Sequence, residues 1–180
     1  MTRIIAGAAR GRRLAVPAKG TRPTSDRVRE SLFSVLDSAL LAGDRGWQDI
    51  SVLDLYAGSG ALGLEALSRG ARSVVLVEKS AAAVRVLDAR SPARVVAMSS
   101  AADLVLIDPP YEVPADDIAT TLAGLLASGW IRHGADVVVE RSARDVDSPL
   151  PVDWEEPRRR EYGDTALWYG RAAADPEEGS

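Results

Sequence analysis

The sequence contains no cysteine and a single histidine, His133. Disulfides and thiol nucleophiles therefore lack the cysteine that they need, while zinc clusters, iron–sulfur sites and Ser-His-Asp relays with a second histidine nearby have little to build on. The sequence also contains no apolar run long enough to span a membrane, and no apolar segment followed by a small-residue cleavage site near its beginning. We therefore expect a cytoplasmic protein with no metal site and no membrane partner.

Acidic residues outnumber basic ones, 26 to 22, but the two signs are unevenly distributed. Residues 1–30 contain eight basic side chains and two acidic ones. A basic arm on an acidic body can bring a phosphate backbone to one face of a protein and repel it from the others. Taken alone, the pattern fits a solvated charged terminus as well as it fits a nucleic-acid-binding arm.

The chain has 180 residues, a length that fits one domain with a small appendage. Short apolar runs alternate with helical patterns from residue 51 onward, which predicts βαβ units and a parallel sheet covered by helices. We expect strands over 51–56, 73–78, 103–107 and 135–140, and helices over 26–42, 61–69 and 115–128. We also expect an N-terminal hairpin over 3–5 and 13–16, and an antiparallel edge over 155–162 and 165–169.

Changes in composition along the chain predict three parts. Residues 1–24 form a basic hairpin arm, residues 25–171 form the α/β domain, and residues 172–180 form a disordered tail. The arm has few large apolar residues, so we expect it to be partly mobile before it binds a partner.

A glycine-rich turn follows the first strand of the predicted domain. Gly58, Gly60 and Gly63 form the pattern G-x-G-x-x-G between a strand and the start of a helix, the context in which this pattern binds nucleotides. Glycines allow the backbone to turn tightly and to approach a ligand closely. Glu78 lies 20 positions after Gly58, where a carboxylate can accept hydrogen bonds from two ribose hydroxyls. This spacing favours a cofactor that contains adenosine.

Asp54 indicates which adenosine cofactor fits. It precedes Gly58 by four positions, and a carboxylate at this point would repel a pyrophosphate but can attract an ammonium group. S-adenosylmethionine has an amino-acid ammonium group and no phosphate, so it fits better than NAD. A structural α/β turn that binds nothing is the remaining alternative.

A second motif, Asp108-Pro109-Pro110-Tyr111, follows the predicted strand 103–107, and open α/β sheets bind ligands at the carboxyl ends of their strands. An exocyclic base amine is a poor nucleophile because its lone pair is delocalised. A catalyst must therefore accept hydrogen bonds from the amine and aim the lone pair at the methyl group. The Asp108 carboxylate and the Pro109 carbonyl can be these acceptors, and Tyr111 can stack on the base. Taken alone, the motif also fits a proline-rich turn after a strand.

Together, Asp54 to Gly60, Glu78 and Asp108 to Tyr111 resemble the cofactor and catalytic motifs of class I S-adenosylmethionine-dependent amino-methyltransferases. Further segments are similar to the RsmD family, which methylates N2 of a guanine, guanine-966, in 16S ribosomal RNA. These segments are 3–7, 11–14, 22–33, 54–67 and 162–165. The similarity covers most of the chain.

The resemblance implies a Rossmann-like class I methyltransferase fold. This fold is a mostly parallel sheet with helices on both faces and an antiparallel C-terminal edge, here with a small N-terminal β-hairpin extension. The resemblance also implies a cytoplasmic, monomeric enzyme that binds S-adenosylmethionine, uses no metal, and acts on 16S ribosomal RNA within the small ribosomal subunit or its assembly intermediate.

Site residues are carried over from the family by position. The catalytic residues are Asp108, Pro109 and Tyr111. The cofactor-binding residues are Asp54, Tyr56, Gly58, Ser59, Gly60, Glu78 and Met98. The residues expected to contact RNA are Arg10, Arg12, Arg13, Arg27 and Arg29.

The interval between the two motifs is shorter than the resemblance implies. Only 30 positions separate Glu78 from Asp108, whereas the family has about one helix-strand segment more in this interval. Asp88-Ala89 or Ala97-Met98 could supply the contact with the adenine ring, and both remain open. Either the chain is shortened here, which weakens the adenine pocket, or the sequence omits a stretch of this interval.

Two other functions fit parts of the sequence. An adenine-N6 methyltransferase acting on RNA or DNA fits the Asp108 motif, because the loop serves any planar exocyclic amine. The lack of a separate target-recognition domain counts against site-specific DNA modification. A non-catalytic RNA-binding or ribosome-assembly module fits the short interval, but the intact Asp108 and Tyr111 argue against it.

Overall fold

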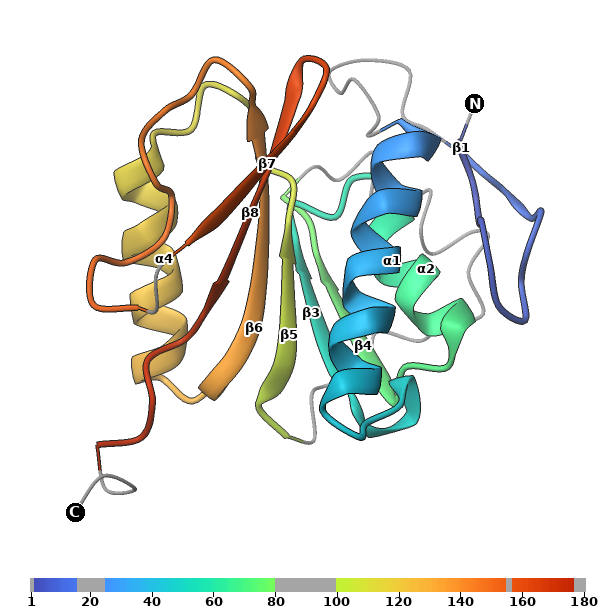
Figure 1. The fold of residues 1–180 in the computed structure, drawn as a ribbon, viewed down its shortest axis with the longest axis horizontal. Helices are drawn as coiled ribbons and strands as arrows, with labels where there is room; N and C mark the ends of the chain where they lie inside the picture. The colour runs from blue at the N-terminus through green and yellow to red at the C-terminus, as the bar shows by residue number, and fades with distance from the viewer. Residues whose placement is uncertain (1, 16–24, 80–99, 155–156, 177–180) are drawn as a thin grey trace. The chain divides into compact units, whose positions relative to one another are not determined.

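The computed structural model describes residues 2–15, 25–79, 100–154 and 157–176. The chain divides into two compact units, Met1–Met98 and Ser99–Ser180, and Figure 1 labels most of their elements. Each unit contains a parallel pair of strands with a helix packed on it. No helix within the described ranges is both long enough and apolar enough to cross a membrane.

The first unit begins with a hairpin of β1 (Thr2–Arg3) and β2 (Arg13–Leu14), which pair antiparallel. It continues with helix α1 (Asp26–Ala42), the 3₁₀ turn η1 (Trp47–Asp49), strand β3 (Ser51–Leu55), helix α2 (Ala61–Arg69) and strand β4 (Ser73–Val77). Strands β3 and β4 pair in parallel, with Leu53 opposite Val75. Helix α2 packs on both strands, which completes the βαβ unit predicted from the sequence.

Helix α1 has the predicted bounds because local signals define both its start and its buried face. The Ser25 side chain accepts a hydrogen bond from the Val28 N–H at 3.2 Å and caps the first turn. The apolar residues of the buried face recur at helical spacing and are Val28, Leu32, Phe33 and Leu36.

Helix α2 lies close to strand β4 because Gly63 has no side chain. A Cβ atom at this position would lie 2.4 Å from Leu76 Cδ2 and 2.8 Å from Val74 Cγ1. The helix ends at Gly70, whose φ of 109° lies in the left-handed region, as expected for a C-cap glycine. The third glycine of the motif is therefore a packing requirement of the βαβ unit.

The second unit contains strand β5 (Ala102–Ile107), helix α4 (Ala115–Ala127) and strands β6 (Ile131–Ser142), β7 (Arg158–Tyr162) and β8 (Thr165–Arg171). Strands β5 and β6 pair in parallel, and every residue of β5 is buried. Strand β8 runs antiparallel to both β6 and β7. The C-terminal segments therefore form the antiparallel edge that the sequence predicts.

Two segments of the second unit differ from their predicted bounds. The strand expected over 135–140 is the longer β6, because the exposed polar residues Arg132 and His133 hide its beginning in the sequence pattern. The tail expected from residue 172 is ordered at its start: Ala172 is buried, and its N–H donates to the Ala135 carbonyl oxygen at 2.9 Å. Residues 177–180 lie outside the described part of the chain.

Candidate functional site

The loop after β3 contains three residues with positive φ. Tyr56, Gly58 and Gly60 have φ values of 59°, 54° and 73°. Such angles are easy for glycine, whereas at Tyr56 the backbone strain is about 1–3 kcal/mol. Gly60 caps the N-terminus of α2, and Ser59 between the two glycines is half-buried. The loop therefore turns sharply and places the unpaired N–H groups of a helix N-terminus beside the end of β3.

Glu78 follows β4 and lies against this loop. Its Oε2 accepts the Gly58 N–H at 2.8 Å. The Ala57 N–H donates to the Val77 carbonyl oxygen at 3.0 Å and joins the same two segments. The half-buried Glu78 carboxylate thus stands at the carboxyl ends of two parallel strands, where ligands of α/β sheets bind.

Asp54 has a structural contact that the sequence pattern did not predict. The residue is 1% exposed, and its Oδ2 accepts the Gly63 N–H at 2.8 Å. This bond satisfies one of the N–H groups that a helix leaves unpaired in its first turn, and the negative charge is favourable near the helix N-terminus. Only the packing of α2 on β3 brings these two residues together.

The second motif directly follows β5, which ends at Ile107. Asp108 is half-buried, Pro109 is buried, and Tyr111 is 47% exposed. The Val113 N–H donates to the Pro110 carbonyl oxygen at 3.0 Å and closes the turn. A compact turn therefore presents a partly accessible carboxylate and an exposed aromatic residue at the carboxyl end of a parallel strand.

Arg141 was not singled out from the sequence, yet it contacts this turn. It is buried near the end of β6, and its Nη2 lies 2.9 Å from Asp145 Oδ2. The same nitrogen donates to the Tyr111 carbonyl oxygen at 3.5 Å. Two further nitrogens, Nε and Nη1, have no hydrogen-bond partner among the described residues. The register of β5 and β6, with Ile107 opposite Val139, explains why a residue of β6 lies level with the turn.

The arginines expected to contact RNA do not share one environment. Four of them are exposed, and these are Arg10, Arg12, Arg13 and Arg27. Arg29 is fully buried, and its Nη2 donates to the Arg3 carbonyl oxygen and to Asp26 Oδ1, each at 2.7 Å. A buried guanidinium cannot reach a phosphate, so the expectation for Arg29 is corrected. The residue instead holds the hairpin to α1.

Other titratable groups in the described part of the chain show no further site. Within the described ranges, no cluster of three or more His, Asp or Glu side chains could hold a metal ion. Burial, together with the neighbouring Tyr162, raises the pKa of Tyr169 above its ordinary value. The Tyr169 phenol therefore stays protonated at neutral pH and cannot act as a base.

Comparison with known proteins identifies the family. The profile of a family described as "Conserved hypothetical protein 95" matches residues 2–95 and 88–171. Ribosomal RNA small subunit methyltransferase D of Escherichia coli (strain K12) is 33% identical over 180 residues, which cover 91% of this chain and 86% of the relative. The chain belongs to the RsmD family. The putative rRNA methyltransferase YlbH of Bacillus subtilis (strain 168) is 32% identical, covering 92% of this chain and 96% of the relative.

Solved structures agree with membership of the RsmD family. The putative methyltransferase yhhF from Escherichia coli has a TM-score of 0.74 at 34% identity, covering 96% of this chain and 98% of that chain. A 16S rRNA N2 methyltransferase from Thermus thermophilus, solved with AdoMet and guanosine, shares the fold at 23% identity. Its TM-score is 0.57, with 92% of this chain and 43% of that chain covered. The predicted class I methyltransferase fold is confirmed.

The RsmD-family profile matches in two ranges that share residues 88–95, between Glu78 and Asp108. The two matched ranges therefore meet within the short interval noted in the sequence. Met98 and the two proposed adenine contacts, Asp88-Ala89 and Ala97-Met98, lie outside the described residues. Their role stays a prediction.

Proposed function

We propose that this protein transfers a methyl group from S-adenosylmethionine to the exocyclic N2 amine of a guanine in 16S ribosomal RNA. RsmD-family membership supports the reaction and the substrate, because relatives that are 33% and 34% identical are named ribosomal RNA small subunit methyltransferase D. The observation that carries the proposal is the position of Asp108 and Tyr111 directly after β5, at the carboxyl end of a parallel strand.

The loop after β3 suits S-adenosylmethionine because two carboxylates, those of Asp54 and Glu78, lie beside it. Glu78 Oε2 lies 2.8 Å from the Gly58 nitrogen, so a carboxylate for the ribose hydroxyls stands beside the backbone that approaches the ligand. Asp54 adds a second negative charge, and two carboxylates disfavour a pyrophosphate and favour a cationic ligand. The other residues proposed to line the cofactor in this loop are Tyr56, Ser59 and Gly60. When bound, S-adenosylmethionine supplies the electrophilic methyl group.

The turn after β5 acts on the target base. Asp108 and the Pro109 carbonyl accept hydrogen bonds from the guanine amine, which directs its lone pair toward the methyl group. Tyr111 stacks on the guanine after it leaves its RNA helix. As the new N–C bond forms, the bond between the methyl group and sulfur breaks, which leaves S-adenosylhomocysteine as the product. The amine loses a proton, which Asp108 accepts directly or through a water molecule. The residues of this chain therefore contribute by positioning the base and accepting a proton.

The exposed arginines contact RNA phosphates in this proposal. They are Arg10, Arg12 and Arg13 on the hairpin and Arg27 on α1. The substrate is the small ribosomal subunit or its assembly intermediate, so the reaction takes place in the cytoplasm. The protein acts as a monomer.

Methyl transfer from labelled S-adenosylmethionine to small ribosomal subunits that lack their native methylations tests this function. We expect N2-methylguanosine in the digested nucleosides. Asp108→Ala should lower the amount formed by about 100-fold or more, because general-base catalysis and positioning of the base are lost. The control is Asp116→Ala, an exposed carboxylate in the first turn of α4, which should retain activity. N6-methyladenosine would instead identify an adenine methyltransferase. Cofactor binding without any product would favour a non-catalytic module.

A further inference from the structure

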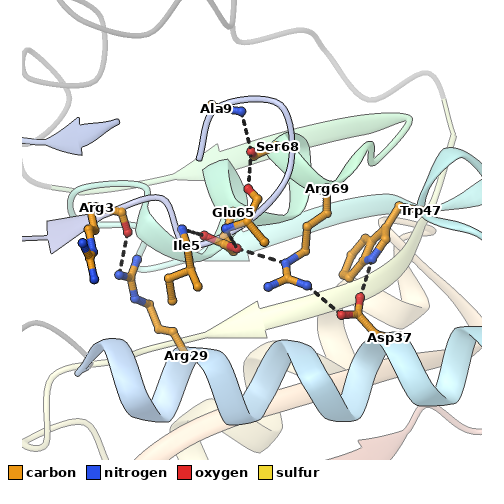
Figure 2. Close-up of polar contacts among 10 residues, drawn as sticks. Arg3, Ile5, Ala9, Arg29, Asp37, Trp47, Glu65, Ser68 and Arg69 are labelled. Atoms are coloured by element: carbon orange, nitrogen blue, oxygen red, sulfur yellow. Dashed lines mark hydrogen bonds and ion pairs between the residues drawn. The ribbon is translucent and has the colours of Figure 1, made fainter. Parts of the chain in front are cut away.

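The N-terminal hairpin is attached to helix α2 by hydrogen bonds to the side chains of Glu65 and Ser68 (Figure 2). Glu65 of α2 is 0% exposed, and its Oε2 accepts the Ile5 N–H at 2.7 Å. Its Oε1 accepts the Ala6 N–H at 3.0 Å. A buried carboxylate is strongly unfavourable unless it is paired and hydrogen-bonded. The hairpin backbone therefore supplies two of the hydrogen bonds that stabilise the buried Glu65 carboxylate in the folded state.

Ser68, one helical turn further along α2, extends the attachment. Its Oγ donates to the Ala6 carbonyl oxygen at 2.6 Å and accepts the Ala9 N–H at 2.9 Å. The Ser68 carbonyl oxygen accepts the Ala8 N–H at 2.8 Å. Gly7 lies so close that a Cβ atom there would stand 1.8 Å from the same carbonyl oxygen. These contacts attach residues 5–9 to α2, and the partial mobility expected from the composition of the arm stays a prediction.

The same carboxylate connects the hairpin to α1. Arg69 Nε donates to Glu65 Oε1 at 3.0 Å, and Arg69 Nη1 donates to Asp37 Oδ2 at 2.6 Å. Asp37 in turn accepts the Trp47 Nε1–H at 2.8 Å. Figure 2 shows that Glu65 lies between the hairpin and Arg69 in this network. The Arg69 guanidinium therefore pairs with the buried carboxylate that holds the hairpin backbone.

We propose that Glu65 is a positioning residue for the RNA substrate. Helix α2 is nine residues long, and its N-cap, Gly60, belongs to the proposed cofactor loop. Glu65 fixes the hairpin that carries the exposed Arg10, Arg12 and Arg13 to this helix. RNA bound by the hairpin is therefore held in a defined place relative to the cofactor loop, and the hairpin loses little conformational freedom on binding. This inference rests on the proposed function for its substrate.

Two glycines of the hairpin provide a matched pair of variants. Gly7 and Gly11 have similar positive φ values, 79° and 82°, so alanine strains the backbone equally at both. An added Cβ at Gly7 collides with the Ser68 backbone, whereas at Gly11 no atom lies within 4 Å. Only Gly7→Ala therefore pushes the hairpin off α2, and it changes neither Glu65, nor the cofactor loop, nor any arginine.

The readouts are the KM and the dissociation constant for small ribosomal subunits that lack their native methylations, and the dissociation constant for S-adenosylmethionine. We expect Gly7→Ala to raise the KM and the dissociation constant for ribosomal subunits about tenfold. The dissociation constant for S-adenosylmethionine should stay within about twofold of its unmutated value. Gly11→Ala keeps all three within about twofold of the unmutated protein. Equal values for the two variants, or an equal loss of S-adenosylmethionine affinity with Gly7→Ala, would overturn the inference.

Glu65→Gln tests the carboxylate itself. Loss of a negative charge alone strengthens RNA binding, so weaker binding by Glu65→Gln identifies positioning rather than electrostatics. Asp136→Asn removes the same charge from a more exposed carboxylate, which lies 3.3 Å from Arg171 Nη2, and it serves as the charge control. RNA binding by Glu65→Gln that is equal to or stronger than that of the control would contradict the role of Glu65.

Hydrogen exchange of the Ile5 and Ala6 amides separates this inference from the proposed function. These amides should exchange faster in Gly7→Ala than in Gly11→Ala or the unmutated protein, because their acceptor is Glu65. If the unmutated protein methylates no RNA, the proposed function fails, while exchange and RNA binding still test the attachment. If methylation is normal and neither exchange nor RNA binding differs between the variants, only the inference fails.

Discussion

A single buried arginine connects the loops that follow β5 and β6. Arg141 contacts the Tyr111 carbonyl oxygen and Asp145, so replacing it with methionine frees the turn that would hold the base. We expect Arg141→Met to lower kcat/KM for ribosomal subunits about tenfold, because small displacements of a reacting group reduce rates steeply. Folding should persist with some loss of stability, because the Asp145 side chain is 34% exposed as a whole but its Oδ2 is buried beside Arg141. Steady-state kinetics and thermal unfolding measure the two effects.

Arg171→Met is the control for this prediction. Arg171 also pairs with an aspartate, Asp136, but its side chain is 52% exposed and lies on β8. Its loss should leave kcat/KM within about twofold, because exposed ion pairs contribute little. Equal losses of activity in the two variants would mean that Arg141 contributes only charge.

The role of Arg141 and that of Glu65 could not be predicted from the sequence. Arg141 contacts a residue 30 positions away, and Glu65 contacts one 60 positions away. Nothing in the local pattern around a buried arginine or glutamate indicates such a partner, because the contact depends on tertiary packing. The acidic residue Glu78 could be predicted, because the end of the strand after a glycine loop lies at a fixed place in a βαβ unit.

At the level of the elements, two helical glycines should respond oppositely to alanine. Alanine normally stabilises a helix relative to glycine by about 0.5–1 kcal/mol, and Gly124 in α4 has no neighbouring atom within 4 Å of an added Cβ. Gly124→Ala should therefore raise the free energy of unfolding by about that amount. At Gly63 the added Cβ meets Leu76, Val74 and Asp54 Oδ2 at 2.4, 2.8 and 3.0 Å. Gly63→Ala should lower stability by about 1–3 kcal/mol despite its better helix propensity.

Urea unfolding of the two glycine variants measures this difference. Gly63→Ala should also weaken binding of S-adenosylmethionine, because the Gly63 N–H is held by Asp54 at the base of the cofactor loop. Stabilisation by both substitutions would show that α2 can move away from β4, and that the third glycine of the motif is not required for packing.

The same local logic explains which elements could be predicted. Helix α1 begins with a serine cap and has a regular apolar face, so both its bounds and its buried residues follow from the sequence. Strand β6 is longer than predicted because Arg132 and His133 project from its exposed beginning, where pairing with β5 rather than burial defines the strand. Element type depends on local pattern, whereas strand ends depend on the partner strand.

For the molecule as a whole, charge and family membership agree on an RNA substrate. The proposed cofactor loop lies in the first unit, the Asp108 turn lies in the second, and the hairpin adds exposed arginines to the first. A chain with four more acidic than basic residues can bind RNA only where its positive charges are concentrated. The position of both motifs at the ends of strands could be predicted from the sequence, but the attachment of the hairpin to α2 could not.

The salt dependence of RNA binding tests where these charges act. Arg10→Ala, Arg12→Ala and Arg13→Ala combined should lower the slope of log affinity against log salt by about two, because each lost phosphate contact removes about 0.7–0.9. The matched control replaces three exposed arginines of the second unit, Arg144, Arg158 and Arg160, with alanine. Both triple variants change the net charge equally, so only direct contact distinguishes their slopes. A larger decrease in slope for the variant lacking Arg144, Arg158 and Arg160 would indicate that RNA contacts the edge formed by β7 rather than the hairpin.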